Sequence, residues 1–366
     1  MPATGGAGQV STLELFFDLV FVFTITQLTV VLTGDPSIGG VLQAALLFGN
    51  VWWMYGGYAW LTNAVPPRAL AIRLLLLVGM GGFMLIALSI PTAFSGGGVI
   101  FGIGYMVVTL VHTGLFLRSS QQSVFKAVGR LGPFNAVSAA LLLFAGFTPT
   151  GLRIALFTAG FILHWITPYL SGTAGFRIRS GHFVERHGLI LLIALGESVV
   201  AVGIGLTPIG LPTGRILTAL LGLALTAGLW WLYFSGEDER AQSAMEAAPE
   251  ARRPGLALNA FGYVFLMTLG AIVLVAAGLK LAVVHYDEPA SNAAALFLAV
   301  GVGLYALSLA WFRRVLRSGP LTVRLALAGA ALPTAAVGIK LTSLAQLITL
   351  VLTVTLAAAA ESRAAR

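Results

Sequence analysis

Long apolar stretches separated by short polar ones dominate the sequence. A helix that spans a bilayer needs about 20 predominantly apolar residues, because each residue adds about 1.5 Å and the hydrocarbon core is about 30 Å thick. The pattern therefore predicts an all-α fold, a polytopic integral membrane helical bundle of about twelve transmembrane helices. The predicted stretches are residues 13–33, 38–60, 69–93, 98–117, 124–147, 151–170, 184–206, 213–235, 258–284, 292–312, 321–338 and 341–360.

The charge content excludes several classes of protein. Only 9% of the residues are charged, against about 25% in a soluble domain, so most of the surface is expected to face lipid. The chain has no cysteine, which excludes disulfide scaffolds, thiolate metal sites and cysteine nucleophiles. The net charge of +8 is spread over short loops rather than gathered in a basic stripe, so no nucleic-acid partner is predicted.

The lysines and arginines predict an orientation. Seventeen of the 21 lie in or beside the loops that follow even-numbered stretches, or in the C-terminal tail. By the positive-inside rule, both termini are expected in the cytoplasm, together with the long polar loop at about 236–257. The first stretch contains Glu14 and Asp18 and follows no basic segment, so it is expected to be retained rather than cleaved as a signal peptide.

A short pattern recurs six helices apart. Trp52-Trp53-Met54-Tyr55 in the second stretch matches Trp230-Trp231-Leu232-Tyr233 in the eighth. This predicts a 6+6 duplication, with a first half at 1–180 and a second at 181–366 in the same orientation. The alternative is that Trp and Tyr gather at membrane interfaces in any case. The tryptophans, Trp60 included, accordingly either line a cavity for an aromatic or lipid-like ligand or form an interfacial belt.

Two acids open the first stretch, in Glu14-Leu15-Phe16-Phe17-Asp18. The i, i+4 spacing places both carboxylates on one helix face. Two carboxylates this close disfavour joint ionisation, which suits a proton carrier. Two structural interpretations stay open. The acids satisfy the helix N-terminus and its dipole, or they pair with an arginine and lock two helices together.

The seventh stretch begins with His182-Phe183-Val184-Glu185-Arg186-His187. The run resembles the His-x-x-Glu-His metalloprotease pattern, but the extra Arg186 moves His187 off the face of His182 and places a cation beside any metal. The favoured interpretation is therefore an ion-pair cluster rather than a metal site. In it, Glu14 or Asp18 pairs with Arg186 or His187 across the interface between the halves.

Other polar residues lie inside the predicted helices. Glu197, followed by Ser198, lies near the middle of the seventh helix, and an ionisable group at that depth is a functional hypothesis by default. The alternative is a neutral glutamic acid that hydrogen-bonds helices together. Gln27 and the other amides favour interhelical hydrogen bonding, while His112 and His164 are interpreted as core histidines. No phosphate-binding loop, Gly-x-Ser-x-Gly or His-Glu-x-x-His motif is present, so no catalytic residue, metal or cofactor is predicted.

Two stretches together resemble a known family. Glu14-Leu15-Phe16-Phe17-Asp18-Leu19-Val20-Phe21-Val22-Phe23, followed by Thr26-Gln27-Leu28, is similar to the opening signature of the bacterial low temperature requirement protein A family. His182 to Ile190, followed by Ala194-Leu195-Gly196-Glu197-Ser198, is similar to its second signature. The resemblance implies a multipass protein of the bacterial inner membrane, named for a cold-growth phenotype. It implies no biochemical activity, and it places Glu14, Asp18, Gln27, Glu185, Arg186, Glu197 and Ser198 within the signatures.

These observations favour an ion- or proton-coupled secondary transporter of a small solute. Glu14, Asp18 and Glu197 are expected to titrate, with Arg186 and His187 as counter-charges; Gln27, Glu185 and Ser198 complete the set of candidate ion- or substrate-binding residues. Lipid and the solute are the expected partners, and a homo-oligomer is compatible with the sequence. Two alternatives stay open. One is a membrane-embedded enzyme acting on a lipid or isoprenoid, with His164, His182, Glu185, His187 and Glu197 as its reactive groups. The other is a non-catalytic sensor or assembly factor.

Overall fold

The predicted helices are present in the structure. The computed structural model describes residues 10–118, 122–206 and 212–364, and in these ranges each of the twelve predicted stretches is helical and no strand occurs. Eleven helices among the described residues are long and apolar enough to cross a membrane. A further helix, α2 (Ile38–Ala64), has 27 residues, but its glycines, tryptophans and tyrosines make it less hydropathic. The prediction of a polytopic helical membrane protein is confirmed.

The chain packs into two compact units, each of which is made of segments that are not continuous in the sequence. The first unit comprises Met1–Val31, Leu42–Leu189 and Met245–Gly262, and the second comprises Leu32–Val41, Ile190–Ala244 and Tyr263–Arg366. The predicted division at residue 180 concerns duplication rather than packing, and it stays a prediction. Residues 1–9 and 365–366 lie outside the described residues, and the cytoplasmic location of both termini also stays a prediction.

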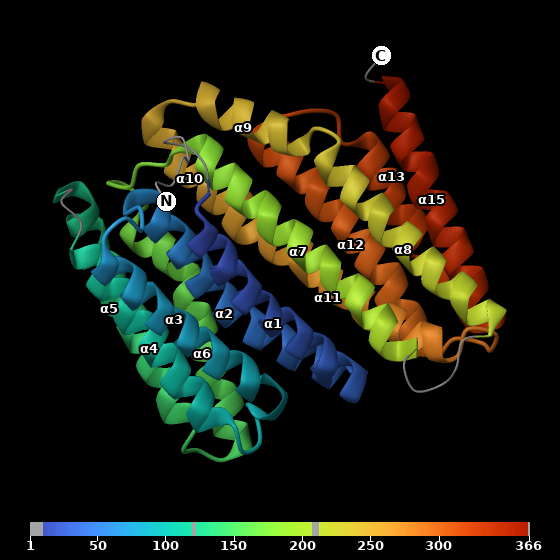
Figure 1. Ribbon diagram of the computed structural model, residues 1–366, viewed down its shortest axis with the longest axis horizontal. Coiled ribbons are helices and arrows are strands. Elements are labelled where there is room, and N and C mark those ends of the chain that lie inside the picture. The colour runs from blue at the N-terminus through green and yellow to red at the C-terminus, as the bar shows by residue number, and fades with distance from the viewer. Residues whose placement is uncertain (1–9, 119–121, 207–211, 365–366) are drawn as a thin grey trace. The chain divides into compact units, whose positions relative to one another are not determined.

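The first unit contains the helices of the N-terminal half of the chain and the start of α7 (Figure 1). They are α1 (Thr12–Gly34), α2, α3 (Leu70–Ser89) with the 3-10 turn η1 (Ile90–Thr92), α4 (Gly98–Leu117), α5 (Gln122–Ala145), α6 (Thr150–Ser171) and α7 (Ser180–Leu206).

Glycines let α3, α4 and α5 approach one another backbone to backbone. A Cβ on Gly102 of α4 would lie 2.9 Å from the carbonyl oxygen of Leu142 on α5, and one on Gly104 would lie 2.7 Å from the carbonyl oxygen of Gly82 on α3. Lipid gives helices no hydrophobic reason to associate, so close packing of small residues is a main source of their attraction. The glycines therefore set the spacing of these three helices.

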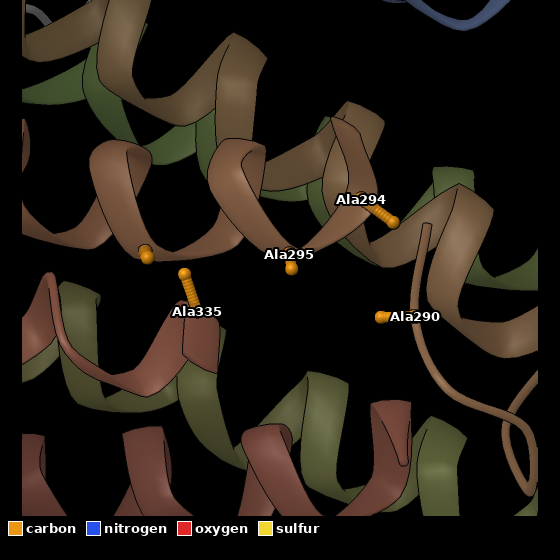
Figure 2. Close-up of a cluster of buried hydrophobic side chains, with 5 residues drawn as sticks. Ala290, Ala294, Ala295 and Ala335 are labelled. Atoms are coloured by element: carbon orange, nitrogen blue, oxygen red, sulfur yellow. The ribbon is translucent and has the colours of Figure 1, made fainter. Parts of the chain in front are cut away.

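The second unit contains α7 from Ile190 onward and most of α9 (Glu237–Ala247), whose end belongs to the first unit. It also contains α8 (Thr213–Phe234), α11 (Phe265–Val284), α12 (Asn292–Leu316), α13 (Thr322–Ala331), α14 (Thr334–Lys340) and α15 (Ser343–Ala364). Small residues again set a close contact. Ala290, Ala294, Ala295, Ala299 and Ala335 form a buried cluster, and Ala335 of α14 points towards the helix that carries Ala294 and Ala295 (Figure 2).

Two segments differ from the sequence-based expectation. Residues 236–257, predicted as a loop, form α9, the 3-10 turn η2 (Glu250–Arg252) and α10 (Arg253–Ala257), followed by the π-helix η3 (Leu258–Val264). Three acids in the first turn of α9 favour a helix, because negative charge stabilises the helix N-terminus. Gly236, with a φ of 116°, makes the turn that precedes it.

The eleventh predicted stretch is not one continuous helix. It divides into α13 and α14 on either side of Leu332 and Pro333. Proline has no backbone N–H and its ring clashes with the preceding turn, so it interrupts a helix interior. Hydropathy alone did not reveal this break, although Pro333 is visible in the sequence.

Candidate functional site

A buried ion cluster joins α1 and α7 in the first unit. Nη1 of Arg186 lies 3.2 Å from Oε1 of Glu14, and its Nη2 lies 3.3 Å from Oδ1 of Asp18. The exposed fractions of the three side chains are 1%, 3% and 0%. The ion pair predicted from the sequence is therefore present. Its role in ion or substrate binding stays a prediction.

Neutral groups on α2 complete the cluster. The hydroxyl of Tyr55 donates to Oδ1 of Asp18 at 2.9 Å, and Arg186 also donates to the hydroxyl oxygen of Thr62. The guanidinium of Arg186 lies 5.5 Å from the ring centroid of Phe17 and 5.7 Å from that of Tyr55. Aromatic faces attract cations, so these rings replace part of the hydration that Arg186 loses on burial.

Glu14 has a structural role as well. Ser11 and Glu14 form a capping box, in which the backbone N–H and hydroxyl of Ser11 donate to Oε2 of Glu14 at 2.9 and 2.8 Å. The backbone N–H of Glu14 lies 3.4 Å from the Ser11 hydroxyl oxygen. Nε2 of His182 lies 3.1 Å from Oε1 of Glu14. Both oxygens of Glu14 are thus engaged, and two of the structural interpretations of this residue hold at once.

Asp18 differs from Glu14 in one respect. Its Oδ1 accepts from Tyr55 and Arg186, whereas its buried Oδ2 has no hydrogen-bond partner among the described residues. A buried polar atom without a partner is rare and calls for a specific explanation. The cluster also holds two carboxylates against one permanently charged base, so a proton or another small cation would balance its charge.

The other predicted site residues lie elsewhere. Glu185 is exposed, and its Oε2 accepts a 3.3 Å bond from the backbone N–H of Val10. The imidazole 3.1 Å from Glu14 is that of His182, and Nδ1 of His187 lies 2.8 Å from the Phe183 carbonyl oxygen. Of the pairs expected between the two acids and Arg186 or His187, the structure shows those of Arg186 with both Glu14 and Asp18. A pairing of His187 with an acid stays a prediction.

The remaining candidates are separated from this cluster along the chain. Glu197 and Ser198 are buried and belong to the second unit. Glu197 follows Arg186 by eleven residues on α7, which is about 16 Å along a helix axis. Gln27 is half-buried on α1. The structure brings Glu14, Asp18 and Arg186 together, and it leaves the roles of Glu197, Ser198 and Gln27 as predictions.

The reactive groups of the enzyme alternative do not form a metal site. Among the described residues, no three His, Asp or Glu side chains are grouped so that they could hold a metal ion. His164 is fully buried and lies 3.2 Å from the hydroxyl of Tyr105 through its Nε2. This contact agrees with its interpretation as a core histidine.

A pocket with about 90 Å³ of free space lies in the first unit, between α2, α4, α5 and α6. Its walls include Trp52, Trp53 and Trp60 from α2 and Trp165 from α6, and no Asp, Glu, Lys or Arg lines it among the described residues. Trp230 and Trp231 are instead 39% and 50% exposed. The two interpretations of the tryptophans therefore divide between the copies of the motif: the first copy lines a cavity, and the second has the exposure expected of a belt.

The pocket and the ion cluster share a wall. Tyr55, which donates to Asp18, stacks on Trp52 with ring centroids 4.9 Å apart and an angle of 17° between the planes. The indole N–H of Trp52 donates to the carbonyl oxygen of Gly262 in η3 at 2.9 Å. A change in the bond between Asp18 and Tyr55 would thus reach a residue of the pocket through one stacked ring.

Sequence analysis missed a second buried ion cluster, which lies in the second unit. Oε1 of Glu237 lies 2.6 Å from Nε of Arg313 and 3.2 Å from Nη2 of Arg324. Glu361 of α15 accepts two bonds of 2.8 Å from Arg324. These residues lie at helix ends, where charges are ordinarily solvated, so their burial was not expected from the sequence. A helix interpretation of 236–257 would have placed Glu237 at an N-terminus.

A bundle of apolar helices with ion clusters buried inside it defines a multipass α-helical membrane protein. The chain matches the model of the bacterial low temperature requirement A protein (LtrA) over residues 9–359, and it belongs to that family. It is 27% identical over 316 residues to an uncharacterized protein of Rhizobium meliloti (strain 1021), an alignment that covers 82% of this chain and 76% of the relative. No solved structure matches it.

Proposed function

We propose that this protein is a secondary transporter of the bacterial inner membrane that couples the movement of a small solute to a proton, and that Asp18 binds the proton. The observation that carries the proposal is the unpartnered Oδ2 of Asp18. It belongs to a cluster with two carboxylates and one arginine, all at least 97% buried.

The net charge of the cluster favours binding of a proton. Ionised Glu14 and Asp18 beside Arg186 leave one uncompensated negative charge, before any contribution from His182. Isolated charge is unfavourable in the membrane interior. A proton on Oδ2 of Asp18 removes that charge, while Oδ1 stays bonded to Tyr55 and Arg186.

Protonation would also change the contacts of Asp18. A neutral carboxyl attracts Arg186 less than a carboxylate does, so Arg186 would then depend on Glu14 and Thr62. The bond from Tyr55 would weaken as well, because hydrogen bonds to ionised acceptors are the stronger kind. Since Tyr55 stacks on Trp52, the state of Asp18 would bias the shape of the pocket. Such differential contacts are what a coupled conformational change requires.

A pair of tyrosine contacts supports the proposed duplication. Tyr105 of α4 donates to the carbonyl oxygen of Asn50 on α2, and Tyr305 of α12 donates to that of Leu229 on α8, each at 2.9 Å. Each acceptor lies four or five residues before the tyrosine of a Trp-Trp-x-Tyr motif. Two repeats of one orientation are a known plan of transporters. In this plan Glu197 is a second candidate for proton binding.

The proposal is tested in liposomes that contain the purified protein and an internal pH-sensitive dye. A panel of small uncharged solutes is added to wild type, Asp18→Asn and Glu185→Gln. The expected result is a solute-dependent pH change that is lost in Asp18→Asn and retained in Glu185→Gln, because Glu185 is exposed and outside the cluster. A coupled pH change of undiminished size in Asp18→Asn would contradict the assigned role.

A further inference from the structure

The tryptophan-lined pocket has two kinds of wall. Its apolar part includes four indoles, and three of these have a fixed N–H: Trp52 donates to Gly262, Trp53 to Asn135 and Trp165 to Gly49. An indole held by its N–H presents a rigid, flat face of large area. Aromatic rings prefer to pack on such faces in offset or edge-on geometry.

The polar part is small and specific. Asn135 accepts the indole N–H of Trp53 through Oδ1 at 2.9 Å, and its amide nitrogen makes no hydrogen bond to any described residue. His112 also lines the pocket and is 7% exposed. Neither of its ring nitrogens has a hydrogen-bond partner among the described residues, and Nε2 faces Gly57, where an added Cβ would lie 2.9 Å from it. A pocket of this kind orients its ligand through a few polar groups.

We infer that this pocket binds an uncharged, flat aromatic molecule that carries a hydrogen-bond acceptor such as a carbonyl. The flat rings would pack on the indoles, and the acceptor would take the amide N–H of Asn135 or the N–H of His112. An anionic or cationic ligand would find no counter-charge, since no described residue of the lining is acidic or basic in the manner of Asp, Glu, Lys or Arg. A saturated acyl chain would leave the amide nitrogen of Asn135 and the ring nitrogens of His112 without partners, which burial makes unfavourable.

That this ligand is the transported solute rests on the proposed function, whereas its binding does not. The pocket reaches the ion cluster through the stacked rings of Trp52 and Tyr55. Occupation of the pocket and protonation of Asp18 would then favour one arrangement of the same pair of rings. This gives a physical route for coupling within the first unit.

The experiment is equilibrium binding of 2-acetylnaphthalene to the full-length protein in detergent, by dialysis against protein-free micelles. Two related probes separate the elements of recognition: naphthalene lacks the acceptor, and 2-naphthoate keeps acceptor oxygens but carries a negative charge. We expect saturable binding of one 2-acetylnaphthalene per chain, with naphthalene about tenfold weaker, as the loss of one buried hydrogen bond implies. Binding of 2-naphthoate at equal affinity would overturn the inference, and so would equal binding of naphthalene.

Matched glycine variants separate the pocket from partition into the micelle. Gly132 lines the pocket and Gly114 of α4 does not, and an added Cβ meets nothing within 4 Å at either position. Gly132→Leu is expected to weaken binding at least about tenfold, because a leucine side chain fills space that the ligand needs. Gly114→Leu is expected to bind as wild type does. Equal affinities in the two variants would overturn the inference.

The outcomes also separate this inference from the proposed function. Pocket-dependent binding without any coupled pH change would support the ligand class and contradict transport of it. A coupled pH change with other solutes, in a protein that does not bind 2-acetylnaphthalene, would support transport and overturn the ligand class.

Discussion

Nη1 of Arg186 lies 3.2 Å from Oε1 of Glu14, and this contact joins residues that are 172 positions apart in the chain. The same guanidinium reaches Asp18 one turn further along α1. One arginine thus fixes α7 against two successive turns of α1. The three side chains are at most 3% exposed, so we expect the first unit to depend on this contact, because a buried charge that loses its partner is strongly destabilising.

Removal of the shared cation should strongly destabilise the protein. Arg186→Gln leaves Glu14 and Asp18 buried without a counter-charge, and breaking a buried ion pair from one side costs about 3–5 kcal/mol. The melting temperature in detergent should fall accordingly. Arg177→Gln is the matched control, because its pair with Glu250 is 74% and 62% exposed and is expected to contribute less than about 1 kcal/mol. Equal melting temperatures for the two variants would contradict a central role for Arg186.

Loss of the Tyr55 hydroxyl should lower the stability of the protein. Tyr55→Phe keeps the ring stacked on Trp52 but removes the donor to Asp18. Hydrogen bonds to charged groups contribute about 1.5–3 kcal/mol, so chemical denaturation should show a loss in that range. Tyr169→Phe, at a position that is 76% exposed, should leave stability nearly unchanged. A Tyr55→Phe protein as stable as wild type would show that Arg186 alone satisfies Oδ1.

The second ion cluster allows a comparison within one helical turn. Glu237→Gln removes the carboxylate that three arginines share, since Arg240 also lies 2.9 Å from it. The remaining positive charges would repel, with an expected loss of about 3–5 kcal/mol. Glu239→Gln removes the same charge from the same first turn of α9 at an exposed position, so it controls for the helix dipole. If both variants unfold at the same denaturant concentration, the cluster adds no stability.

Two glycines of α4 should respond in opposite directions to alanine. At Gly102 a Cβ would lie 2.9 Å from the carbonyl oxygen of Leu142, and backbone cannot move aside as a side chain can. Gly102→Ala is therefore expected to destabilise the protein by about 1–3 kcal/mol. Gly114→Ala meets nothing within 4 Å and should stabilise by up to about 1 kcal/mol, through the higher helix propensity of alanine. Thermal unfolding of the pair checks the sign of each change.

Much of the fold could be predicted because hydropathy is a local property. The window at 98–117 coincides with α4, and that at 213–235 differs from α8 by one residue. The break at Pro333 and the helical form of 236–257 were not predicted, because both segments were classified by hydropathy alone. Proline interrupts the first segment, and acids at the N-terminus of α9 favour a helix in the second. In the candidate site, the pairing of Arg186 with Glu14 and Asp18 followed from charge neutrality in a membrane.

The sequence by itself determined that the chain is a helical membrane protein and that Glu14, Asp18 and Arg186 must find partners, because lipid solvates neither backbone nor charge. Only the tertiary structure decided which partners they find. It placed His182 beside Glu14 and left Oδ2 of Asp18 without a partner among the described residues. In the structure Trp52 and Trp53 line a pocket, whereas Trp230 and Trp231 are exposed. The two copies of the Trp-Trp-x-Tyr motif differ in this way because the surroundings of a side chain depend on the helices packed against it, which local sequence does not specify.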